Sequence, residues 1–192
     1  MKSWATIAAA ACAFSAHAGD FVFFDQFEAS LHPVTGSVIV SEIMSNPTLV
    51  SDAAGEWFEL ANVSDQTVDL GGCTVKQNAS EDTLPAYALA AGSFAVAARN
   101  SELASNGNVT AFATFTFGLA STGTIDLNCD GRLIDEVTWP GESQGHSRSL
   151  YPQYFSASGN DDVVFGWCYT TQLYNEMDTG SPNAANELCP AG

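Results

Sequence analysis

The feature that most restricts the fold of this chain is a series of short β-type runs separated by turn residues. Each run has four to eight residues, rich in Val, Ile, Thr, Phe or Trp, and is bounded by Gly, Pro, Asn, Asp or Ser. No stretch of ten or more residues has the 3.6-residue apolar period of a capped helix. The pattern therefore predicts an all-β sandwich or barrel. The expected strands are 37–44, 56–60, 67–70, 73–76, 93–97, 111–117, 124–129 and 133–139.

The clearest local prediction is a β-hairpin around Asp130-Gly131, because Asp-Gly between two strands favours a type I′ turn. Alternate residues from Ile125 to Cys129 are apolar, and the polar residues between them take the opposite face. Cys129 should therefore point into the core, where a disulfide to Cys73 would cross it.

The N-terminus has the pattern of a secretory signal peptide. Residues 1–3 include the positively charged Lys2, residues 4–14 are apolar, and Ala16 and Ala18 are the small residues that a signal peptidase requires. The apolar run has about half of the roughly 20 residues that span a bilayer, so it does not predict a membrane anchor. We expect a secreted or periplasmic protein, cleaved after Ala18. A lipoprotein acylated at Cys12 is the weaker alternative.

Cleavage would leave an even number of cysteines, and in an exported chain such a number indicates disulfides. None of these cysteines lies in a CxxC motif, so a thiolate zinc site or a redox motif has little support. Three pairings are open, and we favour the one in which the last two cysteines close the irregular C-terminal stretch. The predicted bonds are Cys73–Cys129 and Cys168–Cys189.

The charge balance argues against polyanionic partners. The chain has 22 Asp and Glu residues, and without Lys2 it has four Lys and Arg residues, a formal charge of −18. Proteins bind nucleic acids by neutralising phosphates with Lys and Arg, and anionic membranes attract the same side chains. We therefore expect no nucleic-acid binding and no membrane insertion. The acidity either keeps an exported protein soluble or serves a cation or a basic partner.

A possible nucleophile motif is present but incomplete. Residues 141–145 fit G-x-S-x-G around Ser143, and His146 follows directly. In hydrolases this Ser sits on a strand-to-helix turn, and its His comes from far along the chain. No helix follows here, so a chance match in a loop is favoured over a hydrolase that uses Ser143 and His146. We predict no catalytic residues and no cofactor.

A calcium loop is also only half present. Asp126, Asn128, Asp130 and Gly131 match its first half, but the twelfth position, which needs a bidentate Glu, is Val137. A strand with alternating apolar and polar residues, followed by a turn, accounts for the same residues without a metal. Calcium therefore stays an alternative ligand and no metal residue is assigned.

Two carboxylates, Glu42 and Glu59, lie on expected strands rather than in an evident cleft. Paired carboxylates can perform acid–base chemistry on glycosides. Their placement on strands instead favours structural hydrogen bonding or a solvated face.

Several segments of the chain follow one another in a specific order. They are Val40–Pro47, Gly55–Asn62, Val68–Gly72, Thr83–Pro85, the strand after Gly92, the Asp-Gly hairpin with Ile134-Asp135, and Thr179–Asn186. In this order they resemble the lamin tail domain in its exported bacterial form. The similarity covers roughly residues 37–186, with Cys73 where an aromatic residue is common and Asn183 where Gly is usual. The resemblance implies an immunoglobulin-like β-sandwich that acts as a binding or scaffolding module. It supplies no catalytic residues.

We therefore expect a signal peptide at 1–18, an aromatic segment or linker at 19–36, and a disulfide-stapled sandwich at 37–192. The expected function is non-enzymatic binding of a protein or cell-surface partner through loops or a sheet face. A calcium-dependent adhesive or carbohydrate-binding domain and a purely structural surface component, tethered by the Phe-rich residues 20–31, are the rivals. The core should include Trp57, Phe58, Leu60, Leu70, Phe94, Val96, Leu127 and Val137.

Overall fold

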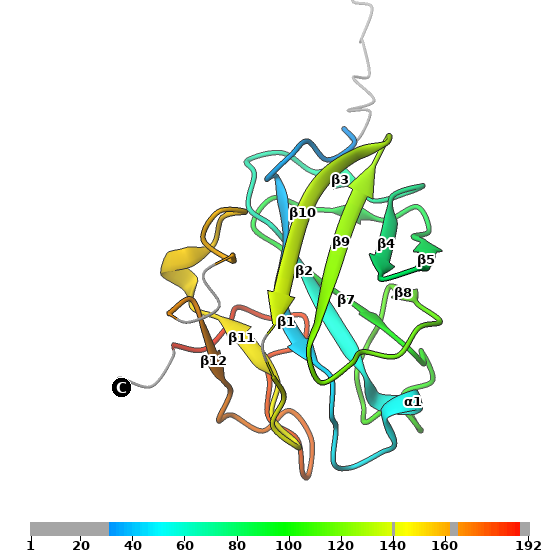
Figure 1. Ribbon diagram of the computed structural model, residues 1–192, viewed down its shortest axis with the longest axis vertical. Coiled ribbons are helices and arrows are strands. Elements are labelled where there is room, and N and C mark those ends of the chain that lie inside the picture. Colours follow the sequence, from blue (N-terminus) through cyan, green and yellow to red (C-terminus); the bar gives the residue numbers. More distant parts are fainter. Residues whose placement is uncertain (1–30, 140, 162–164, 189–192) are drawn as a thin grey trace, which may run out of the picture.

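The computed structural model describes residues 31–139, 141–161 and 165–188, and almost all of its regular structure is β (Figure 1). The two helical elements, α1 and η1, are a single turn each. The elements are β1 Val38–Met44, α1 Asp52–Gly55, β2 Trp57–Asn62, β3 Val68–Asp69, β4 Thr74–Gln77, β5 Ser80–Thr83, β6 Ala88–Leu89, β7 Phe94–Ala98, β8 Ala113–Thr114, β9 Gly123–Cys129, β10 Arg132–Trp139, β11 Arg148–Leu150, η1 Pro152–Tyr154 and β12 Trp167–Tyr169.

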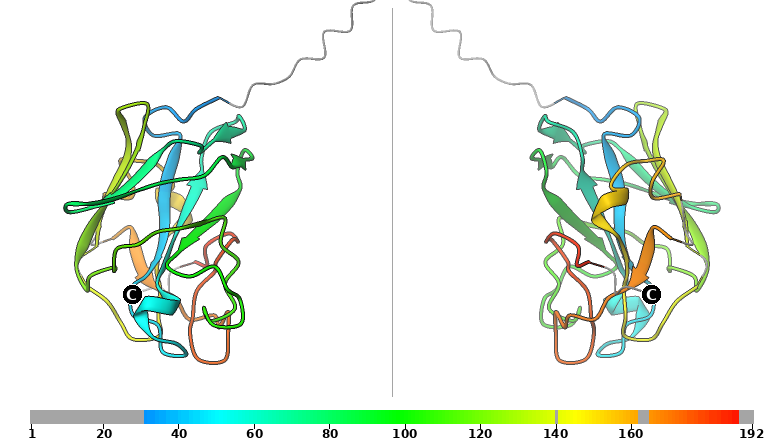
Figure 2. Two further views of the ribbon diagram at one scale, coloured as in Figure 1. Left: turned by 90° about the vertical axis from the view of Figure 1, so that its right-hand side faces the viewer. Right: turned by 90° about the vertical axis from the view of Figure 1, so that its left-hand side faces the viewer.

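The strands of the described residues form two main sheets and a small third one. One main sheet has the order β12-β11-β1-β2-β7-β8, and the other has the order β10-β9-β4-β5. The third sheet pairs β3 with β6. All pairings between the named strands of the described residues are antiparallel except that of β7 with β8. Figure 2 shows the two main sheets facing each other, so the predicted immunoglobulin-like sandwich is confirmed.

The core between the sheets is largely the predicted one. Of the eight expected core residues, Phe94 is half-buried and packs against the core, and the other seven are buried. Trp57 and Val96 face away from the second sheet and form a smaller apolar cluster with Met44, Ala98 and Val109. Strands β1 and β2 are buried along their whole length, because both faces of the six-stranded sheet are covered at this point.

The hairpin prediction is confirmed in detail. Asp130 and Gly131 have φ angles of +52° and +70°, as both central residues of a type I′ turn require. Burial alternates along β9, with Ile125, Leu127 and Cys129 inward.

The Cys73–Cys129 disulfide is also confirmed, with a Cα–Cα distance of 4.2 Å. Its predicted path across the core is wrong. Strands β4 and β9 are neighbours, with Thr74 opposite Asn128, so the bond joins adjacent strands of one sheet. Cys168 is disulfide-bonded as well, but its predicted partner Cys189 lies outside the described residues.

The least accurate strand prediction is 111–117. Only Ala113 and Thr114 form a strand there, because β8 pairs in parallel with β7 over two residues. Four short strands, β5, β6, β11 and β12, were not expected. The signal peptide and most of the Phe-rich segment lie outside the described residues. Residues 34–36 hydrogen-bond to β10 and the turn into β1, for example through Gly36 N and Ile134 O at 2.8 Å.

Candidate binding surface at the edge of the six-stranded sheet

The residues of the hydrolase hypothesis do not form a catalytic pair. Ser143 and His146 close one tight turn, in which His146 N donates to Ser143 O at 3.0 Å. The His146 ring turns away, with its Nδ1 2.8 Å from Thr179 Oγ1 and 3.1 Å from Thr170 O. No hydrogen bond in the described part of the chain joins the Ser143 hydroxyl to this ring. The arrangement thus lacks the nucleophile–base contact that hydroxyl activation needs.

The half-match to a calcium loop is a hairpin. Asp126 and Asn128 are half-exposed on β9, while Asp130 lies in the turn and its carboxylate is 3.0 Å from His32 Nδ1. Among the described residues, no group of three or more His, Cys, Asp or Glu side chains is arranged to hold a metal ion. Asp126, Asn128, Asp130 and Gly131 thus lie in strand β9 and its turn.

The most unusual chemistry is a pair of buried carboxylates on the outer face of the six-stranded sheet. Glu42 of β1 lies directly opposite Glu59 of β2, and both are fully buried. A β-bulge at Ser41 creates this pairing, because it shifts the register between Val40 and Glu42. Without the extra residue, Glu42 would share the inward face of Val40.

A C-terminal strap, defined here as residues 179–187, covers this pair. The strap crosses the face of the six-stranded sheet opposite the second sheet (Figure 2). Glu42 accepts hydrogen bonds from Ser181 N at 2.9 Å, Ser181 Oγ at 2.6 Å and the Ser147 hydroxyl. Glu59 accepts from Asn183 N at 2.6 Å. The carboxylates therefore bind the main chain of the strap to the sheet.

Burial changes the acidity of both groups. Desolvation raises the pKa of Glu42 to about 7, against hydrogen bonds from Ser147 and Ser181 that lower it. Desolvation, and then the charge of Glu42, raise the pKa of Glu59 well above its usual range. Perturbed carboxylates can mark a catalytic site, but these two have no exposed surface. Both accept hydrogen bonds from the strap, which agrees with structural hydrogen bonding, one of the two alternatives expected from the sequence.

Asp135 anchors the segment that leads to β12. Its carboxylate accepts hydrogen bonds from Val40 N at 2.8 Å and Asn160 Nδ2 at 2.7 Å, and burial raises its pKa to about 6. The main-chain oxygen of Asn160 in turn accepts from Trp167 Nε1 at 2.8 Å. Strand β12 is therefore held in place by buried polar contacts.

Strand β12 is an edge strand whose outer main-chain groups face away from the sheet. Tyr151 N donates to Gly166 O at 2.7 Å, and Thr170 N donates to Ser147 O at 3.0 Å. In an antiparallel pair the hydrogen-bonding residues alternate, so the main-chain groups of Trp167 and Tyr169 point outward. The described residues provide no hydrogen-bond partner for these groups.

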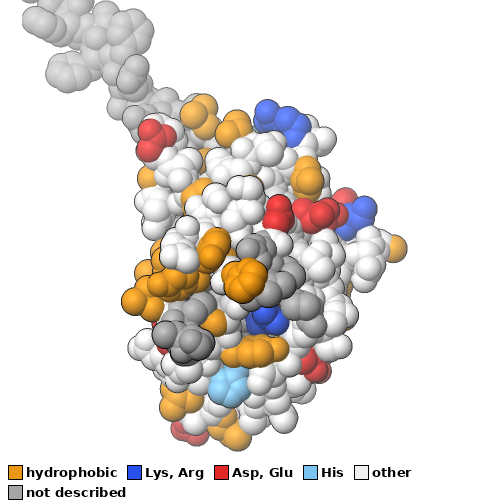
Figure 3. Space-filling view, turned by 60° about the vertical axis from the view of Figure 1, so that its left-hand side comes forward, with side chains coloured by type: hydrophobic (Ala, Val, Ile, Leu, Met, Phe, Trp, Pro, Cys, Tyr) orange, Lys and Arg blue, Asp and Glu red, His pale blue; other side chains and the backbone are white. Residues whose placement is uncertain are grey.

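Apolar and aromatic side chains surround this edge. Phe165, Tyr169 and Leu188 are 74%, 37% and 69% exposed, and Tyr151 is half-buried beside Gly166. The Arg148 guanidinium lies 5.0 Å from the centre of the Tyr169 ring, in cation–π contact. Figure 3 shows hydrophobic side chains gathered on this side of the molecule, with one positively charged side chain among them. We call Arg148, Tyr151, Phe165, Tyr169 and Leu188 the edge patch.

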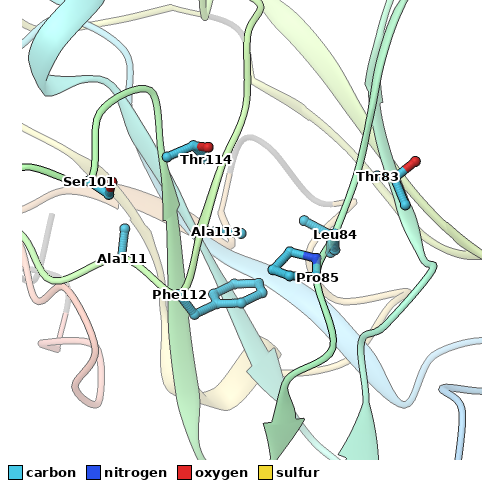
Figure 4. A pocket seen from close by; sticks show the side chains of 8 residues that line it. All are labelled: Thr83, Leu84, Pro85, Ser101, Ala111, Phe112, Ala113 and Thr114. Atoms are coloured by element: carbon cyan, nitrogen blue, oxygen red, sulfur yellow. The ribbon is translucent and has the colours of Figure 1, made fainter.

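The opposite edge of the sandwich has a groove of about 500 Å³ between the chain after β5 and strand β8. Figure 4 shows Phe112 and Pro85 pointing toward each other from opposite walls. No charged side chain lines this groove. Contacts also join its two walls. Thr116 N donates a hydrogen bond to Asp82 Oδ2 at 2.7 Å, and the ring centres of Tyr87 and Phe112 are 4.6 Å apart. This edge is protected by its own side chains, as natural sheet edges usually are.

Residues 32–141, more than half of the chain, match the sequence profile of the Lamin Tail Domain. The chain belongs to the lamin tail domain family. No curated protein matches the chain. Membership confirms the resemblance seen in the sequence, and lamin tail domains are immunoglobulin-like modules of binding and structure rather than an enzyme family.

The matched part of the lamin tail domain ends before β11, so β12, the strap and the edge patch lie beyond it. Sequence reasoning placed Thr179–Asn186 within the resemblance but missed β11, β12 and the aromatic edge. Each of these strands has three residues, which is too short for alternation to be read. In the described part of the chain no helix is long and apolar enough to cross a membrane.

Proposed function

We propose that this lamin tail domain is an exported, non-enzymatic module that binds a protein partner through the edge patch. One observation supports this most directly: β12 is a sheet edge with outward main-chain groups and exposed aromatic side chains, within a very acidic protein. Sheet edges are usually blunted by charge, covered or kept short, because they otherwise pair with other chains. Strand β12 is short as well, but exposed aromatic and aliphatic side chains of the patch lie beside it and offer a surface to a partner.

The composition of the edge patch is that of an interface centre. Tyr, Phe and Arg are enriched where proteins bind each other, whereas Asp, Glu and Lys are depleted. The patch contains two Tyr, one Phe and one Arg, and the Glu187 carboxylate lies at its margin, where it accepts hydrogen bonds from Thr171 N and Thr171 Oγ1. An extended peptide could add a strand to β12 and place its side chains against these rings, the recognition mode called β-augmentation.

Export is supported by two independent features of the chain. The first is the signal-peptide pattern of residues 1–18. The second is disulfide bonding at Cys73, Cys129 and Cys168, which is typical of oxidising compartments. Mass spectrometry of the protein recovered from outside the cytoplasm should find Gly19 as its first residue, and an intact Met1 would contradict export by cleavage.

A site-specific crosslink tests the binding surface. A photoreactive amino acid at Phe165 should give a discrete protein adduct in cells that export the full chain. The matched control is the same amino acid at Thr138, which is exposed on β10 of the second sheet and should give none. Equal adducts at both positions, or none at Phe165, would contradict binding through the edge patch.

A further inference from the structure

We propose that the partner bound at the edge patch is a second copy of this chain, which contributes its Phe-rich residues 20–30 as an added strand on β12. This inference rests on the proposed function and names its partner. It makes the module self-associating, with different surfaces in contact on the two copies.

The chemistry of the donor segment complements the edge patch. Residues 20–30 contain four Phe, at 21, 23, 24 and 27, which match a patch of exposed aromatic and aliphatic side chains. They also contain three carboxylates, Asp20, Asp25 and Glu28. Arg148 is the charged residue of the patch, and its sign is opposite to theirs. Elsewhere the net charge of the molecule would repel such an acidic segment.

The main chain of β12 can accept the donor strand. The outward N–H and C=O groups of Trp167 and Tyr169 offer alternate hydrogen-bonding positions, as in a sheet interior. Phe21 and Phe23 are two residues apart, so a strand would place both on one face, against the patch. β-branched and aromatic residues are enriched in strands, which also favours this segment as a donor.

The anchor of the donor segment favours pairing between copies. Leu31 is fixed to β3, since Asp69 N donates to Leu31 O at 3.0 Å and Leu31 bridges Val68. That anchor lies at one end of the long axis, whereas β12 lies in the other half of the molecule (Figures 1 and 2). The twelve residues 19–30 span at most roughly 40 Å. A segment that folds back on its own molecule must first cross from that anchor to the other half of the molecule, whereas the segment of a second copy can pair with β12 along its whole length.

A contact between two different surfaces repeats from head to tail. Each copy offers one donor segment and one acceptor edge, so the assembly should grow with protein concentration. A variant that lacks either the donor segment or the acceptor edge should no longer assemble with itself. A mixture of a variant without the donor and a variant without the acceptor should still contain one usable donor and one usable acceptor.

The test uses the chain from Gly19 and two variants, each defective in one surface. The donor variant changes Phe21, Phe23, Phe24 and Phe27 to Ser. The acceptor variant is Tyr169→Pro, which removes an outward N–H, a position where Pro is tolerated on an edge strand. We expect the unchanged chain to increase in mass with concentration in analytical ultracentrifugation, and each variant alone to stay monomeric. An equimolar mixture should form dimers with one copy of each variant and nothing larger.

A second acceptor variant, Phe165→Asp with Leu188→Asp, protects the test against misfolding of Tyr169→Pro. It leaves the β11–β12 ladder intact and should also be monomeric alone and dimeric with the donor variant. Melting temperatures close to that of the unchanged chain confirm folding. A chain that stays monomeric at all concentrations, or variants that do not associate when mixed, would overturn self-association. An adduct between Phe165 and a different protein would then still support the proposed function.

Discussion

At the scale of single residues, one extra amino acid decides where a charge is buried. The bulge at Ser41 turns Glu42 to the outer face of the sheet, opposite Glu59. The alternation of β1 could not be read through this bulge, because seven consecutive residues are buried and the two-residue period is interrupted. The sequence did indicate structural hydrogen bonding for these carboxylates, but the partners Ser147 and Ser181 of Glu42 lie more than a hundred positions away in the chain.

Replacement of Glu42 should separate its hydrogen-bonding role from its charge. Glu42→Ala leaves the Ser181 N–H and the Ser147 hydroxyl without their acceptor, and each buried unsatisfied group costs about 1–3 kcal/mol. Glu42→Gln keeps an acceptor of the same shape. We expect urea unfolding at pH 7 to show the Ala variant about 2 kcal/mol less stable than the Gln variant.

The control for Glu42 is Glu136→Ala, because Glu136 is an exposed strand residue on β10. Its effect on the free energy of unfolding should stay within about 0.5 kcal/mol. Equal stabilities of the Ala and Gln variants at position 42 would show that the strap is not held by this acceptor.

At the scale of elements, the sequence predicted the hairpin and the long strands, whose conformation depends on neighbouring residues in the chain. The Asp130-Gly131 hairpin was predictable because its turn type depends on two residues. The long strands β1, β9 and β10 were predictable from their β-branched composition. Strand β8 has two residues and β12 has three, and their ends are set by the neighbouring strands β7 and β11. The binding surface depends on β12, so it could not be read from the sequence.

The disulfide between Cys73, directly before β4, and Cys129 of β9 should stabilise the sandwich by restricting the unfolded chain. It links residues 56 positions apart, and the chain-entropy model gives about 4 kcal/mol for a loop of that size. The double variant Cys73→Ala with Cys129→Ala should therefore unfold at a much lower urea concentration. This variant keeps the disulfide of Cys168 intact, whereas a reductant would break both bonds, so the variant measures the Cys73–Cys129 bond alone. A loss below about 1 kcal/mol would contradict the entropic account.

At the scale of the whole molecule, the C-terminal part of the chain completes the sandwich around the part that matches the family model. The lamin tail match ends at residue 141, and the described residues after it supply strands β11 and β12, the strap and the edge patch. The strap covers the outer face of β1 and β2, which explains why both strands are buried on both sides. This cover encloses the carboxylates, so their protonation is coupled to the folding of the entire domain.

This coupling predicts that the protein is more stable in mild acid than at neutral pH. Burial raises the pKa of Glu42 from 4.5 to about 7, and it also raises the pKa values of Glu59, Glu56 and Asp135. Between pH 4.5 and 7 the folded state therefore binds more protons than the unfolded chain, and the free energy of unfolding falls as the pH rises through this window. Glu42 alone accounts for about 3 kcal/mol of this loss.

Urea unfolding at several pH values between 4.5 and 8 measures this loss directly. Repulsion among surface carboxylates would also lower the free energy of unfolding as the pH rises, so all samples contain high salt, which screens this repulsion. The variant Glu42→Gln cannot ionise at this position, so its stability should depend less steeply on pH than that of the unchanged chain. A free energy of unfolding that stays level or rises from pH 4.5 to 7 would show that these carboxylates ionise in the folded protein as they do in the unfolded chain. The strap would then be held by charged rather than protonated groups.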